Sequence, residues 1–244
     1  MSVTEWKLAG QVTNVDRENE EAWSDVDNIK DCDGNVASVI PLKNKFTDWL
    51  RATDFGFTLV DIPQPSAIEG IEVRITRYAS HSDYITDDAL YLRGPAGQVG
   101  DNKASASEWG ITPTEVTYGA SDDDWNSGLD EFGVRSSDFG VDFSAARGNT
   151  QDDRTAHVDC IQVRVYFTDL FPTQYSGLRI AKGGSMEELC LVADGYGAAA
   201  MGGIPKIRRG GATYDIFLVE TGHMYASSVR IKTPLGIKAI RKKI

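Results

Sequence analysis

The clearest pattern along the chain is a strict alternation of apolar and polar residues in two distant segments. In residues 71–75 three β-branched residues alternate with a glutamate and an arginine, and in residues 158–167 an apolar row from Ile161 to Phe167 alternates with polar residues and a tyrosine. Successive side chains of a β-strand point to opposite faces of its sheet, so each segment is predicted to be a strand with one buried face. We expect the two strands to belong to one large antiparallel sheet.

Short predicted strands separated by turn residues fill most of the remaining chain. Residues 55–62 form a predicted strand that ends at a proline-marked corner, residues 84–92 are typical of a hairpin, and residues 229–240 predict another. Helical periodicity is almost absent; the best candidate, residues 185–191, could equally enter a strand. Many short strands at turn-marked intervals predict an all-β fold, namely a large antiparallel β-sandwich, jelly-roll-like, followed by a small β-rich C-terminal module.

The formal charge of −11 is divided unevenly along the chain. Residues 1–174 contain 31 acidic and 14 basic residues, whereas residues 175–244 contain 5 and 11. This division predicts an acidic β-sandwich domain over residues 1–172 and a small basic docking module over residues 173–244. The alternative interpretation is that the two halves simply attract each other.

Composition disfavours several classes of protein. No stretch approaches 18 apolar residues, so no transmembrane helix is expected, and the N-terminus lacks the basic and apolar regions of a signal peptide. The three cysteines, Cys32, Cys160 and Cys190, are far apart and form no CxxC pair. They are interpreted as reduced, mostly buried thiols of a protein made in a reducing cytoplasm.

The sequence contains no motif that carries a known catalytic chemistry. No phosphate-binding, nucleophile-elbow or zinc-protease motif occurs, and the three histidines are scattered. Residues 31–35 superficially resemble a calcium loop, but the glycine is fourth rather than sixth and position twelve is Leu42. The carboxylates at 122–124 and 152–153 are typical of solvated turns rather than of a glycosidase pair. No catalytic residue, cofactor or metal site is therefore predicted, and the protein is expected not to be an enzyme.

A spaced set of short motifs resembles a domain common among tailed-bacteriophage virion proteins of the head and tail accessory type. The resemblance covers about residues 20–168, and the order and spacing of the pieces carry it rather than any single piece. The pieces are Trp23 with Asp25–Ile29; Asp33–Ala37; Phe55–Phe57; Ile62–Pro63; Ala67–Ile75; Asp101–Ala104; Trp109; Tyr118–Ala120; Asp124–Trp125; Phe139–Val141; and Ala156–Asp159 leading into Gln162–Tyr166. At Trp125-Asn-Ser the chain departs from this pattern, which more often has Trp-Gly.

The resemblance implies a non-enzymatic structural component of a tailed-phage virion, attached to head or tail through protein–protein contacts. It implies assembly in the host cytoplasm, residence in the virion, other virion proteins as partners, and a homo-oligomer whose subunit number is open. The basic module would dock onto an acidic neighbour, with no role for a membrane and none expected for nucleic acid. The candidate docking residues are Arg208, Arg209, Lys238, Arg241 and Lys242.

A second hypothesis is a host-surface glycan-binding adhesin module of a tail or fibre. Its contact residues would be Trp109, Tyr118, Asp123 and Trp125, because exposed aromatic rings beside carboxylates suit sugars. The same aromatic residues could instead be core anchors of the sandwich. A third hypothesis, a glycan-cleaving enzyme, has no positive sign in the sequence, since nothing indicates a cleft with paired carboxylates.

Overall fold

The computed structural model of the chain describes residues 1–18 and 20–170 completely and, of the remainder, the backbone of six strands. It divides the chain into two units, Met1–Phe171 and Pro172–Ile244. The strands described in the second unit are β13 (Leu178–Lys182), β14 (Ser185–Leu189), β15 (Lys206–Arg209), β16 (Ala212–Val219), β17 (Ser228–Thr233) and β18 (Gly236–Ile240).

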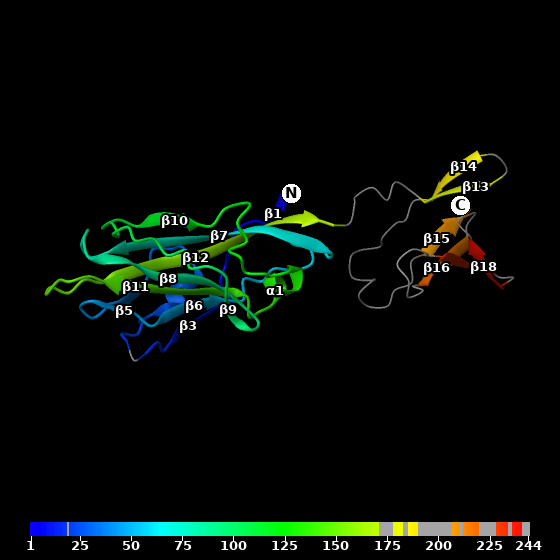
Figure 1. Cartoon of the computed structure of the whole chain (residues 1–244). Helices are drawn as coiled ribbons and strands as arrows, with labels where there is room; N and C mark the ends of the chain where they lie inside the picture. Colours follow the sequence, from blue (N-terminus) through cyan, green and yellow to red (C-terminus); the bar gives the residue numbers. More distant parts are fainter. Residues whose placement is uncertain are drawn as a thin grey trace. The chain divides into compact units, whose positions relative to one another are not determined.

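Two antiparallel sheets lie face to face in the first unit (Figure 1). The β7–β12 sheet contains β1 (Ser2–Val3), β2 (Lys7–Leu8), β4 (Ala37–Val39), β7 (Ser66–Ala79), β10 (Thr114–Tyr118) and β12 (Ala156–Asp169). The β8–β11 sheet contains β3 (Gln11–Val15), β5 (Lys45–Phe46), β6 (Trp49–Thr53), β8 (Ile85–Gly94), β9 (Gly97–Val99) and β11 (Gly140–Arg147). A single short helix, α1 (Glu131–Arg135), and one 3-10 turn, η1 (Val26–Lys30), complete the described part of this unit.

The two alternating segments of the sequence are the two longest strands, β7 and β12, and they pair with each other. Val73 lies opposite Val163 and Ile75 opposite Ile161 in the antiparallel register. These side chains are fully buried, whereas the intervening residues are partly exposed. Burial of each such side chain contributes about 1.5–3 kcal/mol, which explains why the register is strongly specified. The prediction of one large sheet built from these segments is confirmed.

The core lies between the two sheets and confirms the predicted all-β sandwich. From the β8–β11 sheet, Leu50, Leu92 and Phe143 point inward and are completely buried. The ring of Trp109 stacks on Phe143 with centroids 6.0 Å apart. Because Leu50 and Leu92 occupy alternate positions of their strands, their neighbours in sequence must point to the outer face of the sheet.

The backbone of the second unit consists of strand pairs where it is described. Strands β17 and β18 form the hairpin expected over residues 229–240. Residues 185–189, within the best helix candidate, form strand β14, which pairs with β13. The helical reading of that segment is therefore wrong, and its alternative as a strand is confirmed. Strands β15 and β16 also pair, and β16 pairs with β17.

The interpretation of the cysteines as reduced thiols is wrong for two of the three. Cys32 and Cys160 form a disulfide, with Cα atoms 5.1 Å apart across a sequence separation of 128 residues. The bond ties the segment after η1 to β12. Spacing in the sequence gives no hint of it, because only the folded sheet brings the two residues together. Cys190 lies outside the described residues.

Candidate functional site

The aromatic residues proposed as glycan contacts from the sequence lie in the core. Trp109 and Tyr118 are 1% and 6% exposed and share one partner, the buried carboxylate of Asp87. The Trp109 Nε1–H donates to Asp87 Oδ1 at 2.9 Å and the Tyr118 hydroxyl donates to Oδ2 at 2.7 Å. Arg77 completes the cluster with its Nε 3.1 Å from Asp87 Oδ1. Burial, followed by the nearby Asp87 charge, raises the pKa of Tyr118 well above its usual range.

Trp125 and Asp123 also have structural partners. The Trp125 ring is fully buried and its Nε1–H donates to the Ile71 carbonyl at 2.8 Å. Asp123 accepts a hydrogen bond from the Trp125 amide at 2.9 Å and lies 2.8 Å from Lys103 Nζ. Although partial burial acts to raise its pKa, the bonds from Lys103 and from the Trp125 amide lower it below the ordinary value. The core-anchor alternative is thus confirmed for the three aromatic residues, and their burial excludes them as a sugar-stacking surface.

The candidate docking residues of the basic module are not described beyond their backbone. Arg208 and Arg209 lie in β15 and Lys238 lies in β18, while Arg241 and Lys242 lie outside the described residues. Their role in docking stays a prediction.

A different group of polar and aromatic residues gathers on the outer face of the β8–β11 sheet. Its centre is Asp142 of β11, whose side chain is 0% exposed although it points away from the core. In the sheet register Asp142 lies directly opposite Arg51 of β6 on one side and Tyr91 of β8 on the other. Residues opposite each other in this way share a face of the sheet, so the three side chains meet on the outside of the sandwich.

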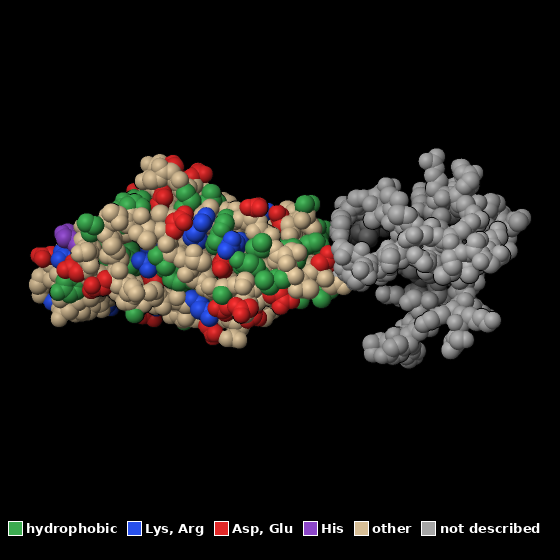
Figure 2. All heavy atoms as spheres, turned by 90° about the horizontal axis from the view of Figure 1, so that it is seen from above, with side chains coloured by type: hydrophobic (Ala, Val, Ile, Leu, Met, Phe, Trp, Pro, Cys, Tyr) green, Lys and Arg blue, Asp and Glu red, His purple; other side chains and the backbone are tan. Residues whose placement is uncertain are grey.

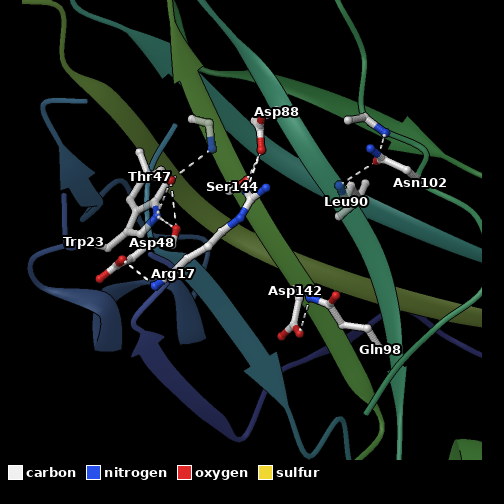
Figure 3. A network of polar contacts seen from close by, with 12 residues as sticks. Arg17, Trp23, Thr47, Asp48, Asp88, Leu90, Gln98, Asn102, Asp142 and Ser144 are labelled. Atoms are coloured by element: carbon white, nitrogen blue, oxygen red, sulfur yellow. Dashed lines mark hydrogen bonds and ion pairs between the residues drawn. The ribbon is translucent and has the colours of Figure 1, made fainter. Parts of the chain in front are cut away.

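Asp142 is buried because three side chains from the neighbouring strands cover it. Arg51 donates two hydrogen bonds to its carboxylate, from Nε at 2.7 Å and from Nη2 at 3.1 Å. The Gln98 amide donates at 2.9 Å (Figure 3), and Arg93 Nη1 lies 3.7 Å away. A paired fork of this kind fixes the plane of the guanidinium as well as its position. Asp142 therefore holds donors from β6 and β9 in defined positions, with Arg93 of β8 nearby.

Two aromatic rings lie beside this cluster on the same face. Trp49 and Tyr91 are partly exposed, and their rings meet edge to face with centroids 6.3 Å apart. The guanidinium of Arg17 lies against Trp49 and Phe46, at 4.1 Å and 3.9 Å from the ring centroids. Such cation–π contacts hold both the cation and the rings in place.

Arg17 is itself fixed by hydrogen bonds, as Figure 3 shows. Its Nη1 donates to Asp88 at 2.5 Å and to the Ser144 hydroxyl at 2.7 Å. Its backbone amide donates to the carboxylate of Asp48 at 2.9 Å, which also accepts from Asn14 at 2.8 Å. These hydrogen bonds hold Arg17 in a fixed position on the sheet.

We call this surface the aromatic–arginine platform; it consists of Arg17, Trp49, Arg51, Tyr91, Arg93 and Gln98. The sequence contains one local signal of this platform, which the alternation of apolar and polar residues does not reveal. The triplets Trp49-Leu-Arg51 and Tyr91-Leu-Arg93 repeat an aromatic–leucine–arginine pattern. Each leucine points into the core, so each triplet presents its aromatic ring and its arginine together on the outer face.

The opposite face of the sandwich has a different balance of charges. Figure 2 views the molecule from the side of β7 and β10, where basic and acidic side chains are interspersed. There Trp6 contacts Arg74 and Arg164, at 4.4 Å and 4.6 Å from its ring centroid. Arg164 donates to Glu72 at 2.5 Å, and Arg74 lies 3.5 Å from Glu115. Each arginine on this face thus has its own glutamate.

Neither a metal centre nor a membrane helix is evident in the residues that the structure describes. Among them, no group of three or more His, Cys, Asp or Glu side chains is placed to hold a metal ion. No helix in the same residues is long and apolar enough to cross a membrane.

Comparison with known proteins yields only distant structural likenesses. No family model matches the chain, and no curated protein matches it. Among solved structures, the N-terminal cellulose-binding domain of β-1,4-glucanase C from Cellulomonas fimi is 12% identical, with 68% of this chain and 90% of that domain covered and a TM-score of 0.28. An exo-β-agarase is 9% identical, with 70% of this chain but only 26% of the agarase covered and a TM-score of 0.29. Likenesses this weak do not bear on function.

Proposed function

We propose that the β-sandwich is a non-enzymatic glycan-binding module and that the aromatic–arginine platform is its binding surface. The observation that carries the proposal is the joint placement of Trp49 and Tyr91 beside Arg51, which Asp142 holds by a pair of hydrogen bonds. Binding sites for small polar ligands combine apolar surface with a few well-placed polar groups. The platform has both, and it lies on an outer sheet face.

The chemistry of the platform matches the two kinds of surface that a sugar presents. The C–H face of a pyranose ring is apolar and packs on aromatic rings, as other apolar groups do. Its hydroxyl groups require hydrogen-bond partners, which the guanidinium groups and the Gln98 amide supply. Because Asp142 and Asp88 already hold these donors, little side-chain freedom is lost when a ligand binds.

The carboxylates of the platform support binding rather than catalysis. Glycoside hydrolysis uses two carboxyl groups, one of which donates a proton to the scissile bond. Asp142 is fully buried under Arg51, and Asp88 accepts hydrogen bonds from Arg17 and Ser144. Both carboxylates therefore serve as acceptors within the protein.

A glycan array probed with the full chain tests this function. Trp49→Ala and Tyr91→Ala should each weaken binding to the recognised glycan about five- to thirtyfold, the effect of losing about 1–2 kcal/mol from a central aromatic contact. Phe132→Ala is the matched control, because Phe132 is 56% exposed on α1 and also lies against an arginine, Arg135. Binding that survives both platform substitutions, or an array with no bound glycan, would refute the proposal.

The resemblance to phage virion proteins supplies the setting that we propose for this module. An accessory protein on a head or tail, present in several copies, would present many identical platforms to a host surface, and avidity would strengthen weak individual contacts. Purified particles of a phage that encodes the chain should contain it, as detected by a specific antibody. Its absence from such particles would refute the virion setting without affecting the glycan-binding proposal.

A further inference from the structure

The arginines of the platform keep donors that the protein does not use. Arg51 donates hydrogen bonds to Asp142 from Nε and Nη2, and Arg17 forms its side-chain hydrogen bonds through Nη1. Arg93 approaches Asp142 only to 3.7 Å, too far for a hydrogen bond. Within the part of the chain that the structure describes, the guanidinium of Arg93 makes no hydrogen bond. All three side chains are 21–24% exposed, so part of each is open to solvent on the outer face of the sheet.

The arginine side chains of the platform outnumber the carboxylates that they contact. The side chains of Arg17, Arg51 and Arg93 contact two carboxylates, Asp88 and Asp142, and Arg93 shares Asp142 with Arg51. A third carboxylate, Asp48, accepts from the backbone amide of Arg17 rather than from a guanidinium. Arg93 is therefore an arginine without a carboxylate of its own, in a segment, residues 1–174, whose formal charge is −17.

From these observations we infer that the ligand is an acidic polysaccharide, in which a carboxylate or sulfate on the sugar binds Arg93 and Arg51. The inference rests on the proposed glycan-binding function and deepens it. A guanidinium presents a planar fork of donors that matches a carboxylate or sulfate, whereas a single hydroxyl group engages only one of them. A ring that packs on Tyr91 places its substituents beside both arginines, because Tyr91 and Arg51 lie on either side of Asp142 in the register.

The test compares each polyanion with its neutral counterpart. Immobilised polygalacturonate and its fully methyl-esterified form share a backbone and differ in the carboxylate, and dextran sulfate and dextran differ in the sulfate. We expect the full chain to bind at least one acidic polymer about tenfold or more tightly than its neutral form, the effect of gaining charge-assisted hydrogen bonds. The pair that shows the preference identifies the anionic group.

Variants locate the preference on the protein. Arg93→Gln should abolish the preference for the acidic polymer. Arg93→Lys keeps the charge but not the planar fork of donors, so it should retain only part of that preference. Because the basic module could capture polyanions by charge alone, the matched control replaces Arg208 and Arg209 together by glutamine, and it should change affinity by less than about twofold.

Each contrary result has a distinct meaning. If the neutral polymers bind as tightly as the acidic ones or more tightly, and Trp49→Ala abolishes this binding, the inference of an acidic ligand is wrong. The proposed glycan-binding function would then still stand. Polyanion binding that needs Arg208 and Arg209 but not Arg93 would also overturn the inference. The absence of any polysaccharide binding that depends on Trp49 would instead refute the proposed function itself.

Discussion

Asp142→Asn should lower the free energy of unfolding of the sandwich by about 2–3 kcal/mol. The side chain is 0% exposed and accepts two hydrogen bonds from Arg51 and one from Gln98. The asparagine amide would place a donor opposite other donors and would remove the negative charge. Breaking a buried ion pair costs about 3–5 kcal/mol, but here the arginines are 23% and 24% exposed and can be partly rehydrated. The expected cost therefore lies below that range.

Urea unfolding followed by tryptophan fluorescence measures this change in the full chain. All five tryptophans lie within residues 1–171, so the signal reports on the sandwich alone. Asp138→Asn is the matched control, since the same substitution at an exposed position just before β11 should change stability by less than about 0.5 kcal/mol. If the two variants unfold at the same urea concentration, Asp142 does not organise the platform as we describe.

A second substitution at the same position separates stability from binding. Replacing Arg51 by methionine and Asp142 by leucine together removes the hydrogen-bonded pair, and the one charge that loses its carboxylate, Arg93, is 24% exposed and can be hydrated. Apolar replacements of buried ion pairs are often neutral or stabilising, so this double variant should regain most of the stability that Asp142→Asn loses. It should not regain glycan binding, because the fixed donors are gone. A double variant that binds normally would show that the arginine plays no part in recognition.

The remaining predictions concern the frame of the sandwich. Cys32→Ser should lower the free energy of unfolding by about 3–5 kcal/mol, because the disulfide to Cys160 closes a loop of 128 residues. Dithiothreitol should shift the urea midpoint of the wild type but not that of the variant. An unchanged wild-type midpoint in the reductant would contradict the disulfide. Burial lowers the pKa of His157, so the unfolded chain binds this proton more readily and stability should fall as the pH drops below about 6.5. His157→Gln should flatten that fall between pH 7 and 5, and an unchanged slope would exclude the histidine as its source. Asp87→Asn should cost about 3–5 kcal/mol in urea unfolding, since it leaves the Arg77 charge buried and unpaired; a loss below 1 kcal/mol would mean that the cluster is solvated.

The sheet that holds the core could be predicted because its signal is local and repeated. Ile71 to Ile75 and Ile161 to Phe167 each alternate over several residues, and a shift by one residue would expose a whole apolar row. The alternation of apolar residues and the free energy gained by burying them therefore specify the same register along the entire strand. The helix α1 carries no comparable signal, since it spans only five residues; its start depends on one hydrogen bond, from the Gly133 amide to the Asp130 side chain.

The error about the aromatic residues has a physical origin. Trp109, Tyr118 and Trp125 occur among glycines, serines and aspartates, a composition typical of exposed loops. In the fold the polar neighbours remain outside while each ring turns inward, and its polar atom finds a buried partner, such as Asp87 or the Ile71 carbonyl. A tryptophan in a polar loop can thus be an anchor that fixes the loop to the core.

The platform could not be located from the sequence because its parts are adjacent only across strands. Arg51, Tyr91 and Asp142 are separated by about forty and fifty residues, and each is a single polar or aromatic residue in an apolar context. The register of β6, β11 and β8 brings them together. The repeated aromatic–leucine–arginine triplet is the one local signal of the platform. It indicates a shared surface only when both triplets are known to flank the same strand.

The buried charge at the centre of the platform is better explained by binding than by stability. Asp142 occupies an outer position of the sheet, where an exposed polar residue or a β-branched one would serve folding equally well. Instead, the chain surrounds a carboxylate with Arg51, Arg93 and Gln98. Burying a charge costs solvation, and replacing a buried ion pair by apolar residues is often neutral or stabilising. The arrangement leaves the donors fixed and incompletely used beside two partly exposed rings. A surface that needs only to be inert has no use for fixed donors, whereas a surface that selects one ligand depends on them.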